Sequence, residues 1–524
     1  MKTLFSILLL ATFAASALAQ QPRPAKGKPS APKPAAAPPA LNAAPGLARD
    51  PIIKTQSLLK VNVTSQAYNV HLPWQKESPS ARRGLGVVMP QNHVLVTAQM
   101  VADATYIELE QPESGRKLPA RVTAVDYEAN VALLQADSTD ARTTEFFKDL
   151  QPMQLDTGVR IGDALSVWQI GQFGDLIVTP MRISKVETAR YFVDGSVFLV
   201  YEGAGIVRSE GNSFTLPVVK GGKLAGLLLR YDSKNQVTTV LPASIIEHFL
   251  KDSTDGKYDG FPNLGVEFQI TLDEQFREYL GMKPGAPGIY VGKVSKGGSA
   301  AHIGLKEGDI LTAINGFRID SRGNYKDPQY GTLSISHIVR GKAYVGDPVT
   351  IKVMREGEPL ELKGELIRKR PEDEVVTPYR FDRGPNYILA GGLLFQELND
   401  TYLDAFGEDR RSGTILRLSH IAQHPEAFEK EGRKKIIFLS LVLPTPSCQG
   451  YERLGGQIVN KVNGQVITDL QALKTALEKP KDGVHAIQLG EFPHLIYLDD
   501  AAMKRDDQGL INGSFRVGSL ERLE

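Results

Sequence analysis

The chain has 524 residues, and its 61 basic and 60 acidic side chains leave a formal net charge of +1. At about 100–200 residues per domain, this length predicts three or so domains, and an apolar share of 42% with 23% charged residues is typical of a soluble globular protein. The balanced charge and the lack of any basic cluster with interleaved aromatics argue against a polyanionic ligand, so we expect no nucleic acid among the partners.

The N-terminus has the pattern of a cleaved signal peptide, residues 1–19. Lys2 supplies a positive start, Thr3 to Ala15 is almost wholly apolar, and Ala17-Leu18-Ala19 gives the small-x-small cleavage pattern. The alternative, a membrane anchor, needs a longer apolar run. A lipid-anchored protein needs Cys directly after the cut, where this chain has Gln20, so we expect no lipid anchor. We expect an exported protein, either periplasmic or extracellular.

The segment after the cut, residues 20–50, is rich in Pro and Ala and is expected to form an extended linker. The longest later apolar run, Ile436 to Leu443, has the length of a strand and ends at Pro444, so no membrane span is expected after cleavage. The single cysteine, Cys448, excludes an internal disulfide, and the His residues lack metal-ligand spacing. We therefore expect no metal and no cofactor.

Short strands separated by Gly, Pro, Asn and Asp follow from Val61 to Leu250, which predicts an all-β barrel or sandwich. Helical periodicity appears only near its end, at Ala243–Leu250. The expected strands include Leu85–Met89, His93–Thr97, Tyr106–Glu110, Val131–Ala136, Ala164–Ile170, Leu176–Ile183, Val197–Tyr201 and Lys223–Leu229.

Two related modules are expected after this barrel region. Gly308 to Gly316 is an apolar strand that ends in Asn-Gly, a strong turn signal, and Gly455 to Gly464 repeats this pattern. In the first module, Gly297 to Ile310 reads Gly-Gly-Ser-Ala-Ala-His-Ile-Gly-Leu-Lys-Glu-Gly-Asp-Ile and closely resembles a stretch of PDZ domains. Lys369 to Gly384 is charged and Pro-containing, which suits a linker between the modules.

PDZ domains bind peptides by adding a strand to a sheet edge, beside a loop whose backbone N–H groups hold a carboxylate. The resemblance implies that Asn263, Leu264, Gly265 and Val266 form this loop and that Val266–Ile270 is the edge strand. The opposing helix would be Ser334–Arg340, with an apolar pocket lined by Ile335, Ile338 and Val339. Alternatively, a neighbouring segment of the same chain fills this groove.

The second module is more divergent. Ala390 to Phe395 resembles the Gly-Leu-Gly-Phe type of loop, and Asp469–Leu477 would be the helix. An insertion from Thr401 through Cys448 resembles the extended terminal PDZ domain of plant-type Deg proteases. A structural or assembly role and ligand capture both stay open for this module.

Upstream, the barrel region resembles the trypsin-like domain of the HtrA/Deg family. The corresponding stretches, in family order, are Gly84–Val88, Val94–Val101, Asp126–Leu134, Gly211–Ser213 and Gly222–Leu229. The resemblance implies a mostly β chain: a trypsin-like double β-barrel followed by two PDZ-like α+β modules. The expected parts are the signal peptide 1–19, the linker 20–50, the protease-like domain 51–252, the first PDZ domain 260–368, the linker 369–384 and the second PDZ-like domain 385–524.

The catalytic triad of this family is broken in the sequence. A serine nucleophile needs a base, and the base needs a carboxylate that orients it. Met100 stands at the His position, and a shift of one residue would place Gln99 there; neither accepts a proton near neutral pH. Asn130 replaces the Asp. Ser213 matches the nucleophile, although alignment on Pro217 would place Phe214 there instead.

These substitutions favour an exported pseudoprotease that binds peptides or unfolded envelope proteins, as a scaffold, chaperone or regulator. A second hypothesis is a divergent active serine endopeptidase that uses Ser213 with an unrecognised base such as His93 or His71. A third is a subunit of mixed assemblies with active relatives. The family resemblance also implies a homo-oligomer.

Overall fold

The computed structural model describes residues 55–136, 139, 141–171, 173–193, 195–208, 215–254, 256–407, 413–513 and 515–523. The expected signal peptide and the linker after it lie outside these residues. Asp50–Glu524 forms one compact unit. Within the described ranges, no helix combines the length and apolar character needed to cross a bilayer.

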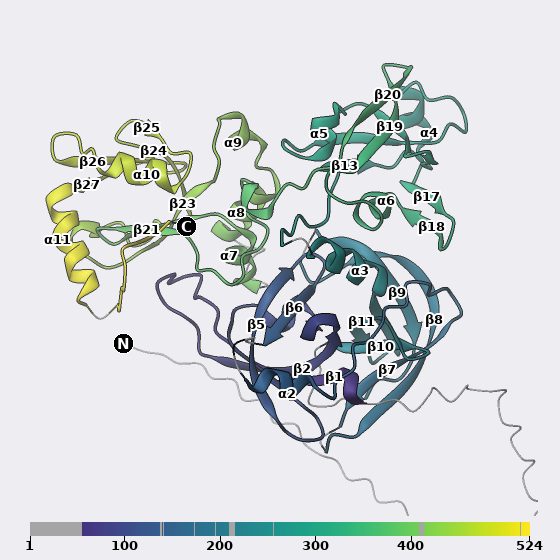
Figure 1. The fold of residues 1–524 in the computed structure, drawn as a ribbon. Coiled ribbons are helices and arrows are strands. Elements are labelled where there is room, and N and C mark those ends of the chain that lie inside the picture. The colour runs from purple at the N-terminus through teal and green to yellow at the C-terminus, as the bar shows by residue number, and fades with distance from the viewer. Residues whose placement is uncertain are drawn as a thin grey trace, which may run out of the picture. The chain divides into compact units, whose positions relative to one another are not determined.

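The first part of this unit is a closed β-barrel with strand order β1-β2-β3-β6-β5-β4 (Figure 1). Its strands alternate as half-buried strands do: in β1, Leu59, Val61 and Val63 are buried in the barrel core, while Lys60 and Asn62 face outward. Closure leaves no unpaired strand edge. The elements are η1 (Thr55–Ser57), β1 (Leu58–Ser65), β2 (Ser80–Met89), η2 (Pro90–Asn92), β3 (His93–Val96), α1 (Ala98–Val101), β4 (Ala104–Glu110), β5 (Lys117–Asp126), β6 (Val131–Ala136) and α2 (Arg142–Phe147).

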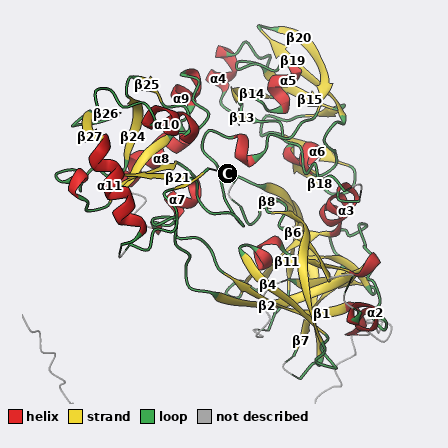
Figure 2. Ribbon diagram, turned by 60° about the vertical axis from the view of Figure 1, so that its left-hand side comes forward, coloured by secondary structure: helices red, strands yellow, loops and turns green. Residues whose placement is uncertain are grey.

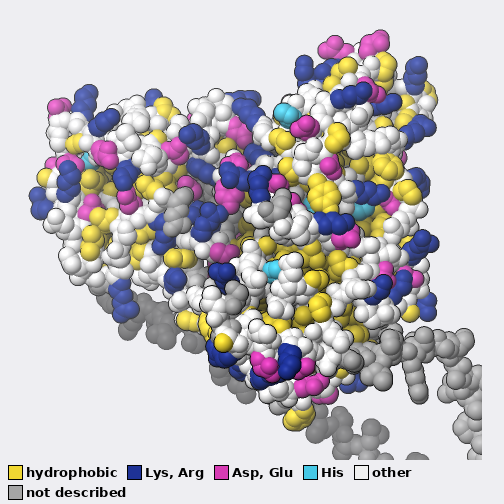
Figure 3. Space-filling model, in the orientation of Figure 1, with side chains coloured by type: hydrophobic (Ala, Val, Ile, Leu, Met, Phe, Trp, Pro, Cys, Tyr) yellow, Lys and Arg dark blue, Asp and Glu magenta, His cyan; other side chains and the backbone are white. Residues whose placement is uncertain are grey.

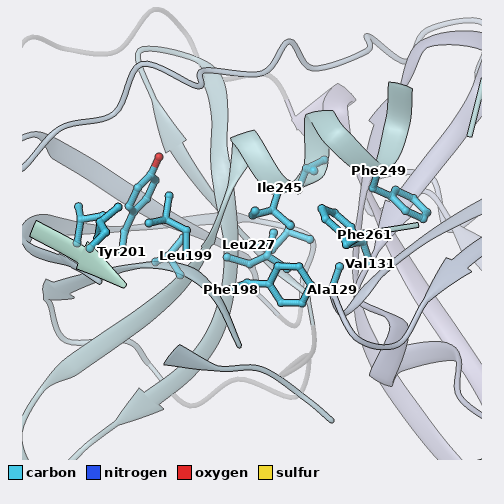
Figure 4. Close-up of a cluster of buried hydrophobic side chains, with 14 of the residues drawn as sticks. Ala129, Val131, Phe198, Leu199, Tyr201, Leu227, Ile245, Phe249 and Phe261 are labelled. Carbon is cyan, nitrogen blue, oxygen red and sulfur yellow. The ribbon is translucent and has the colours of Figure 1, made fainter. Parts of the chain in front are cut away.

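The second barrel is also closed, in the order β10-β11-β12-β9-β8-β7. Its core continues into the first barrel, because Ala129 and Val131 belong to the same buried cluster as Phe198, Leu227 and Phe261 (Figure 4). The elements are β7 (Ala164–Ile170), β8 (Leu176–Arg190), β9 (Val197–Ala204), β10 (Leu216–Lys220), β11 (Lys223–Asp232), β12 (Val237–Pro242) and α3 (Ala243–Asp252).

The third part, the first α+β module, has a sheet in the order β13-β14-β15-β19-β20, with β16 paired to β15 and a separate hairpin β17-β18. Asn315 and Gly316, both at positive φ, form the two-residue turn between β15 and β16 that the Asn-Gly signal predicts. The elements are β13 (Val266–Gln269), α4 (Glu274–Tyr279), β14 (Ile289–Val294), α5 (Ser299–Ile303), β15 (Ile310–Ile314), β16 (Phe317–Arg318), β17 (Asn324–Asp327), β18 (Gly331–Ser334), α6 (Ser336–Arg340), β19 (Pro348–Arg355) and β20 (Glu358–Glu365).

The last part, the second α+β module, is built on a larger sheet, β27-β26-β24-β23-β22-β21-β28, with β25 paired to β24. Asn463 and Gly464 repeat the tight turn of the first module. The elements are η3 (Pro371–Asp373), β21 (Tyr387–Ala390), β22 (Leu393–Glu397), α7 (Asp400–Asp404), α8 (Gly413–Gln423), α9 (Glu426–Lys430), β23 (Ile437–Val442), η5 (Pro446–Cys448), β24 (Gln457–Val462), β25 (Gln465–Val466), α10 (Leu470–Leu477), β26 (Val484–Leu489), β27 (Leu495–Asp499), α11 (Asp500–Ile511) and β28 (Glu521–Arg522).

The expectation of a mostly β chain is confirmed, and strands dominate both barrels (Figure 2). The differences are local. β8 continues to Arg190 rather than ending at Ile183, because it pairs along its length with β7 and then β9. The helix expected from Ser334 begins at Ser336, since Ser334 pairs with Asn324 as the last residue of β18. Positive and negative side chains are interspersed on the face shown in Figure 3, in keeping with the near-zero net charge.

Candidate functional site

Met100, at the position expected for the base, lies on the one-turn helix α1 and is completely buried in the core of the first barrel. Arg82 fixes the end of this helix, since its Nη1 donates hydrogen bonds to the carbonyl oxygens of Gln99 (2.9 Å) and Ala102 (2.8 Å). A buried thioether adds packing to the core and has no basic nitrogen. The helix is therefore held in place by packing and by a guanidinium.

Asn130 lies beside this helix. It adopts a left-handed backbone conformation with φ of 55°, and its side chain is buried. Its Oδ1 accepts a hydrogen bond of 3.0 Å from the backbone N–H of Gln99, the residue before Met100. The fold thus brings the expected base and orienting positions together. An amide at this position satisfies a backbone donor without adding a charge.

The third triad position, Ser213, lies outside the described residues, as does Phe214. Thr215 is the next described residue; it is buried and has φ of 52°, which is strained for a β-branched side chain. Its Oγ1 accepts from the backbone N–H of Thr97 (2.9 Å) and lies 2.8 Å from the Thr97 Oγ1. This contact ties the start of β10 to the first barrel. No local sequence pattern predicts this contact, because 118 residues separate the two threonines.

The two histidines considered as substitute bases lie in different surroundings. His93 Nδ1 is 3.2 Å from the carbonyl oxygen of Pro90. The His71 ring packs edge-on against Tyr402 and Phe406 of the second α+β module, with centroid distances of 5.5 Å and 4.9 Å. Burial lowers the pKa of His71, which reduces its basicity.

The loop between β5 and β6, which holds Asn130, also carries a buried group of charges. We call Asp126, Glu128, Arg340 and Arg368 the charged cluster. Glu128 pairs with Arg340 at 2.6 Å, and Arg368 lies 3.5 Å from Asp126 and 3.8 Å from Glu128. None of the four side chains is more than 14% exposed. The cluster therefore joins the first barrel to helix α6 and to the segment after β20.

Hydrogen bonds complete the charged cluster. Asp126 accepts from the Tyr258 hydroxyl (2.5 Å) and from the backbone N–H of Ala129 (2.7 Å). Burial raises the pKa of Glu128, an effect that Arg340 partly opposes. Burial acts to lower the pKa of Arg368, but the carboxylates of Asp126 and Glu128 outweigh it and raise that pKa above its ordinary value. Arg368 therefore stays charged and needs its carboxylate partners. Sequence reasoning missed this cluster because 212 residues separate Glu128 from Arg340.

In the loop expected to bind a carboxylate, backbone carbonyl groups accept hydrogen bonds from other residues of the same module. The Leu264 and Gly265 carbonyls accept from the N–H groups of Ala300 and Ser295, both at 2.8 Å. Among the described residues, the N–H groups of Leu264 and Gly265 donate no hydrogen bond. Gly265 has φ of 68°, and a Cβ there would lie 3.1 Å from the Cα of Gly298. This geometry suits a loop that offers two N–H donors to a carboxylate.

The edge strand expected beside this loop is β13, which ends at Gln269 rather than Ile270 and, in the described sheet, pairs with β14 alone. The three predicted pocket side chains, Ile335, Ile338 and Val339, are at most 5% exposed. They belong to the core that the module shares with the second barrel, and Arg340 at the end of α6 stacks over the Phe198 ring of β9. A direct role of these three side chains in binding stays a prediction.

A cavity of about 300 Å³ borders the same loop. Its lining includes Asn263 of the loop, Glu128 and Arg340 of the charged cluster, and Lys293 of β14. Lys293 forms ion pairs with Glu267 of β13 (3.2 Å) and with Glu426 of α9 in the second module. The loop of Asn263 and the charged cluster therefore border the same cavity.

The corresponding edge of the second module is closed. There, β22 has β21 on its outer side and β28 beyond it, and Lys474 of α10 pairs with Glu521 of β28 at 2.5 Å. Gly391 and Gly392 form the turn of the β21–β22 hairpin, and the Gly391 N–H donates to Asp507 of α11 at 2.6 Å. In the second module, strands of the chain itself therefore occupy the edge that corresponds to β13 of the first module.

Two segments match family models that are described as PDZ domain: residues 262–366 and residues 376–515. Protease Do-like 2, chloroplastic, of Arabidopsis thaliana is 29% identical over 434 residues, covering 81% of this chain and 68% of that protein. Protease Do-like 4, mitochondrial, of the same plant is 26% identical over 427 residues, covering 80% and 76%. A solved HtrA-type protease, AlgW with decapeptide, aligns with a TM-score of 0.44 and 20% identity over 61% of this chain and 97% of that one. The two expected PDZ domains are thus confirmed.

The charged cluster yields a test of stability. Glu128→Gln is expected to lower the free energy of unfolding by about 3 kcal/mol, because Arg340 then remains buried without its carboxylate. Urea denaturation measures this loss. The double variant Glu128→Leu with Arg340→Met, which removes both charges, is expected to cost less than the single change.

The matched control is Glu145→Gln, which breaks exposed pairs with Arg116 and Lys148 and is expected to change stability by less than about 0.5 kcal/mol. Equal effects of Glu128→Gln and Glu145→Gln would contradict a structural role for the charged cluster.

Proposed function

Because the chain is a homologue of the Do-like and HtrA-type proteases and contains two PDZ domains, we propose that it is an exported, non-proteolytic peptide-binding protein. Its first PDZ domain binds peptides or unfolded envelope proteins, and the chain acts as a scaffold, chaperone or regulator. The observation that carries this proposal is the pair of N–H donors at Leu264 and Gly265 beside the open edge of β13.

The absence of catalysis is supported by chemistry at the site. Proton transfer from a serine requires a basic group in contact with it. Met100 offers a buried thioether at that place, and the Asn130 amide already accepts from a backbone N–H. Loss of a triad residue removes up to about six orders of magnitude in rate in a serine protease. Peptide binding at the PDZ edge does not use these groups.

The peptide-binding loop of the first PDZ domain also explains what a ligand must offer. Two N–H donors recognise a terminal carboxylate, and an edge strand recognises an extended backbone. The second PDZ domain, whose corresponding edge is filled by β21 and β28, has a structural role in this proposal.

Titration of the full-length mature chain with an apolar peptide tests the binding proposal. A peptide with a free C-terminal carboxylate is expected to bind at least about tenfold more tightly than its C-terminal amide, the equivalent of about 1.4 kcal/mol. Gly265→Trp is expected to abolish this preference, because a side chain there meets Gly298. Isothermal titration calorimetry measures both affinities.

The matched control is Gly316→Trp, another glycine of the same domain with positive φ, whose Cβ would point into open space. It carries similar backbone strain away from the loop and is expected to leave binding unchanged. Equal affinities for the carboxylate and the amide in the unmodified chain would refute the proposal.

Export is proposed from the first nineteen residues, from the basic Lys2 to the Ala17-Leu18-Ala19 cleavage pattern. N-terminal sequencing of the protein recovered outside the inner membrane is expected to read Gln20 first. Recovered protein that still begins at Met1 would contradict export with cleavage of a signal peptide.

A further inference from the structure

The two PDZ domains protect the outer edges of their sheets differently. The outer edge of the first, β20, is exposed and carries Glu358, Glu361, Lys363 and Glu365. The outer edge of the second, β27, reads Leu-Ile-Tyr-Leu before Asp499. Charges on an edge strand discourage the addition of another strand, and an uncharged apolar edge invites it. Within one chain, the first edge is therefore protected by charged side chains and the second is not.

The side chains that β27 presents to solvent are large and apolar. Leu495 is 42% exposed and Tyr497 is 56% exposed, while Ile496 and Leu498, which alternate with them, are buried in the core. Phe492, in the turn before the strand, is 83% exposed. These three exposed side chains offer contact area to an added strand.

Two contacts occupy backbone groups of this edge: the Leu495 N–H donates to the carbonyl oxygen of Pro493 at 2.7 Å, and the Tyr451 hydroxyl bonds to Tyr497. The Tyr451 hydroxyl donates to the carbonyl oxygen of Tyr497 at 3.2 Å and accepts from its N–H at 3.4 Å. Both polar groups of Tyr497 therefore point away from β26, toward the free side of the sheet. The hydroxyl makes the same two bonds that a neighbouring antiparallel strand makes, at longer distances. An incoming backbone can displace it.

We propose that β27 is a second peptide-binding edge, which takes an extended apolar segment of another polypeptide with basic residues at its ends. The charge preference comes chiefly from Asp499, which ends the strand and also accepts a hydrogen bond from the backbone N–H of Ala502; Glu491 precedes the strand. Glu491 pairs with Arg417, whereas no cation of the described residues lies within ion-pair distance of Asp499.

The shape of the edge favours a peptide over a second copy of this chain. β27 has five residues, with the turn at Phe492 on one side and helix α11, which starts at Asp500, directly on the other. A short extended peptide needs only those five residues. Two copies paired through β27 would bring the turn of each against the helix of the other.

This site is independent of the one in the first PDZ domain and differs from it in what it recognises. It has no carboxylate-binding loop, so it takes internal segments of a chain rather than C-termini. The test must therefore use a peptide without a free carboxylate.

The experiment measures fluorescence anisotropy of a labelled peptide, Lys-Val-Thr-Val-Thr-Val-Lys, acetylated and amidated at its ends, with the full-length mature protein. Tyr497→Pro is expected to weaken binding at least about tenfold, because it removes an edge N–H that β26 does not use. Leu495→Lys is expected to weaken binding by a similar factor through charge repulsion. Tyr451→Phe is expected to tighten binding about threefold, because the competing hydroxyl is gone.

Controls separate this site from other effects. Leu360→Lys, at an exposed apolar residue of the charged edge β20, is expected to leave the affinity unchanged. A peptide with N-methylated backbone amides on alternate residues is expected not to bind. Thermal unfolding midpoints of Leu495→Lys and Tyr451→Phe close to that of the unmodified protein show that these variants fold.

Three results would overturn the proposal: equal peptide affinity in Tyr497→Pro, Leu495→Lys and the unmodified protein, weaker binding in Tyr451→Phe, or undiminished binding of the N-methylated peptide. Sedimentation that shows dimers lost in Tyr497→Pro, without peptide binding to the unmodified protein, would assign the edge to a second copy instead.

Discussion

The ion pair between Glu128 and Arg340 is the contact on which the rest of the structure depends. Two buried carboxylates and two buried arginines are stable only together, because each alone would lose its hydration without compensation. Their contacts fix the β5–β6 loop of the first barrel, helix α6 of the first PDZ domain and the segment after β20. The apolar side chains around Phe198 and Phe261 then close into one core.

The β5–β6 loop also organises the region that corresponds to the expected protease site. Asp126 and Glu128 at its start hold the first PDZ domain, and Asn130 at its end holds the helix of Met100. Met100 and Asn130, which the family resemblance assigns to catalytic positions, thus contribute packing and hydrogen bonds to the scaffold. The scaffold in turn positions the loop of Leu264 and Gly265, whose N–H groups donate no hydrogen bond among the described residues. In our account, the barrels serve to present this loop.

Local patterns were sufficient to predict much of the fold. The strands Val131–Ala136 and Ala164–Ile170 lie where their alternating or continuous apolar runs predict, and the Asn-Gly turns at Asn315 and Asn463 form as expected. Contacts between distant segments were not predictable. The Thr97–Thr215 contact, the charged cluster and the closure of the second PDZ sheet by β28 each join residues more than 100 positions apart, and no local pattern encodes the partner. For the same reason, the sequence did not predict that Ile335, Ile338 and Val339 also pack into the core shared with the second barrel.

The most direct measurement is the fate of an unfolded substrate protein incubated with the mature chain. Intact-mass spectrometry and size-exclusion chromatography of the same sample report cleavage and complex formation together. We expect the substrate to keep its full mass and to co-elute with the chain. Fragments that disappear when Ser213 is replaced by Ala would contradict it and identify the chain as an active serine endopeptidase.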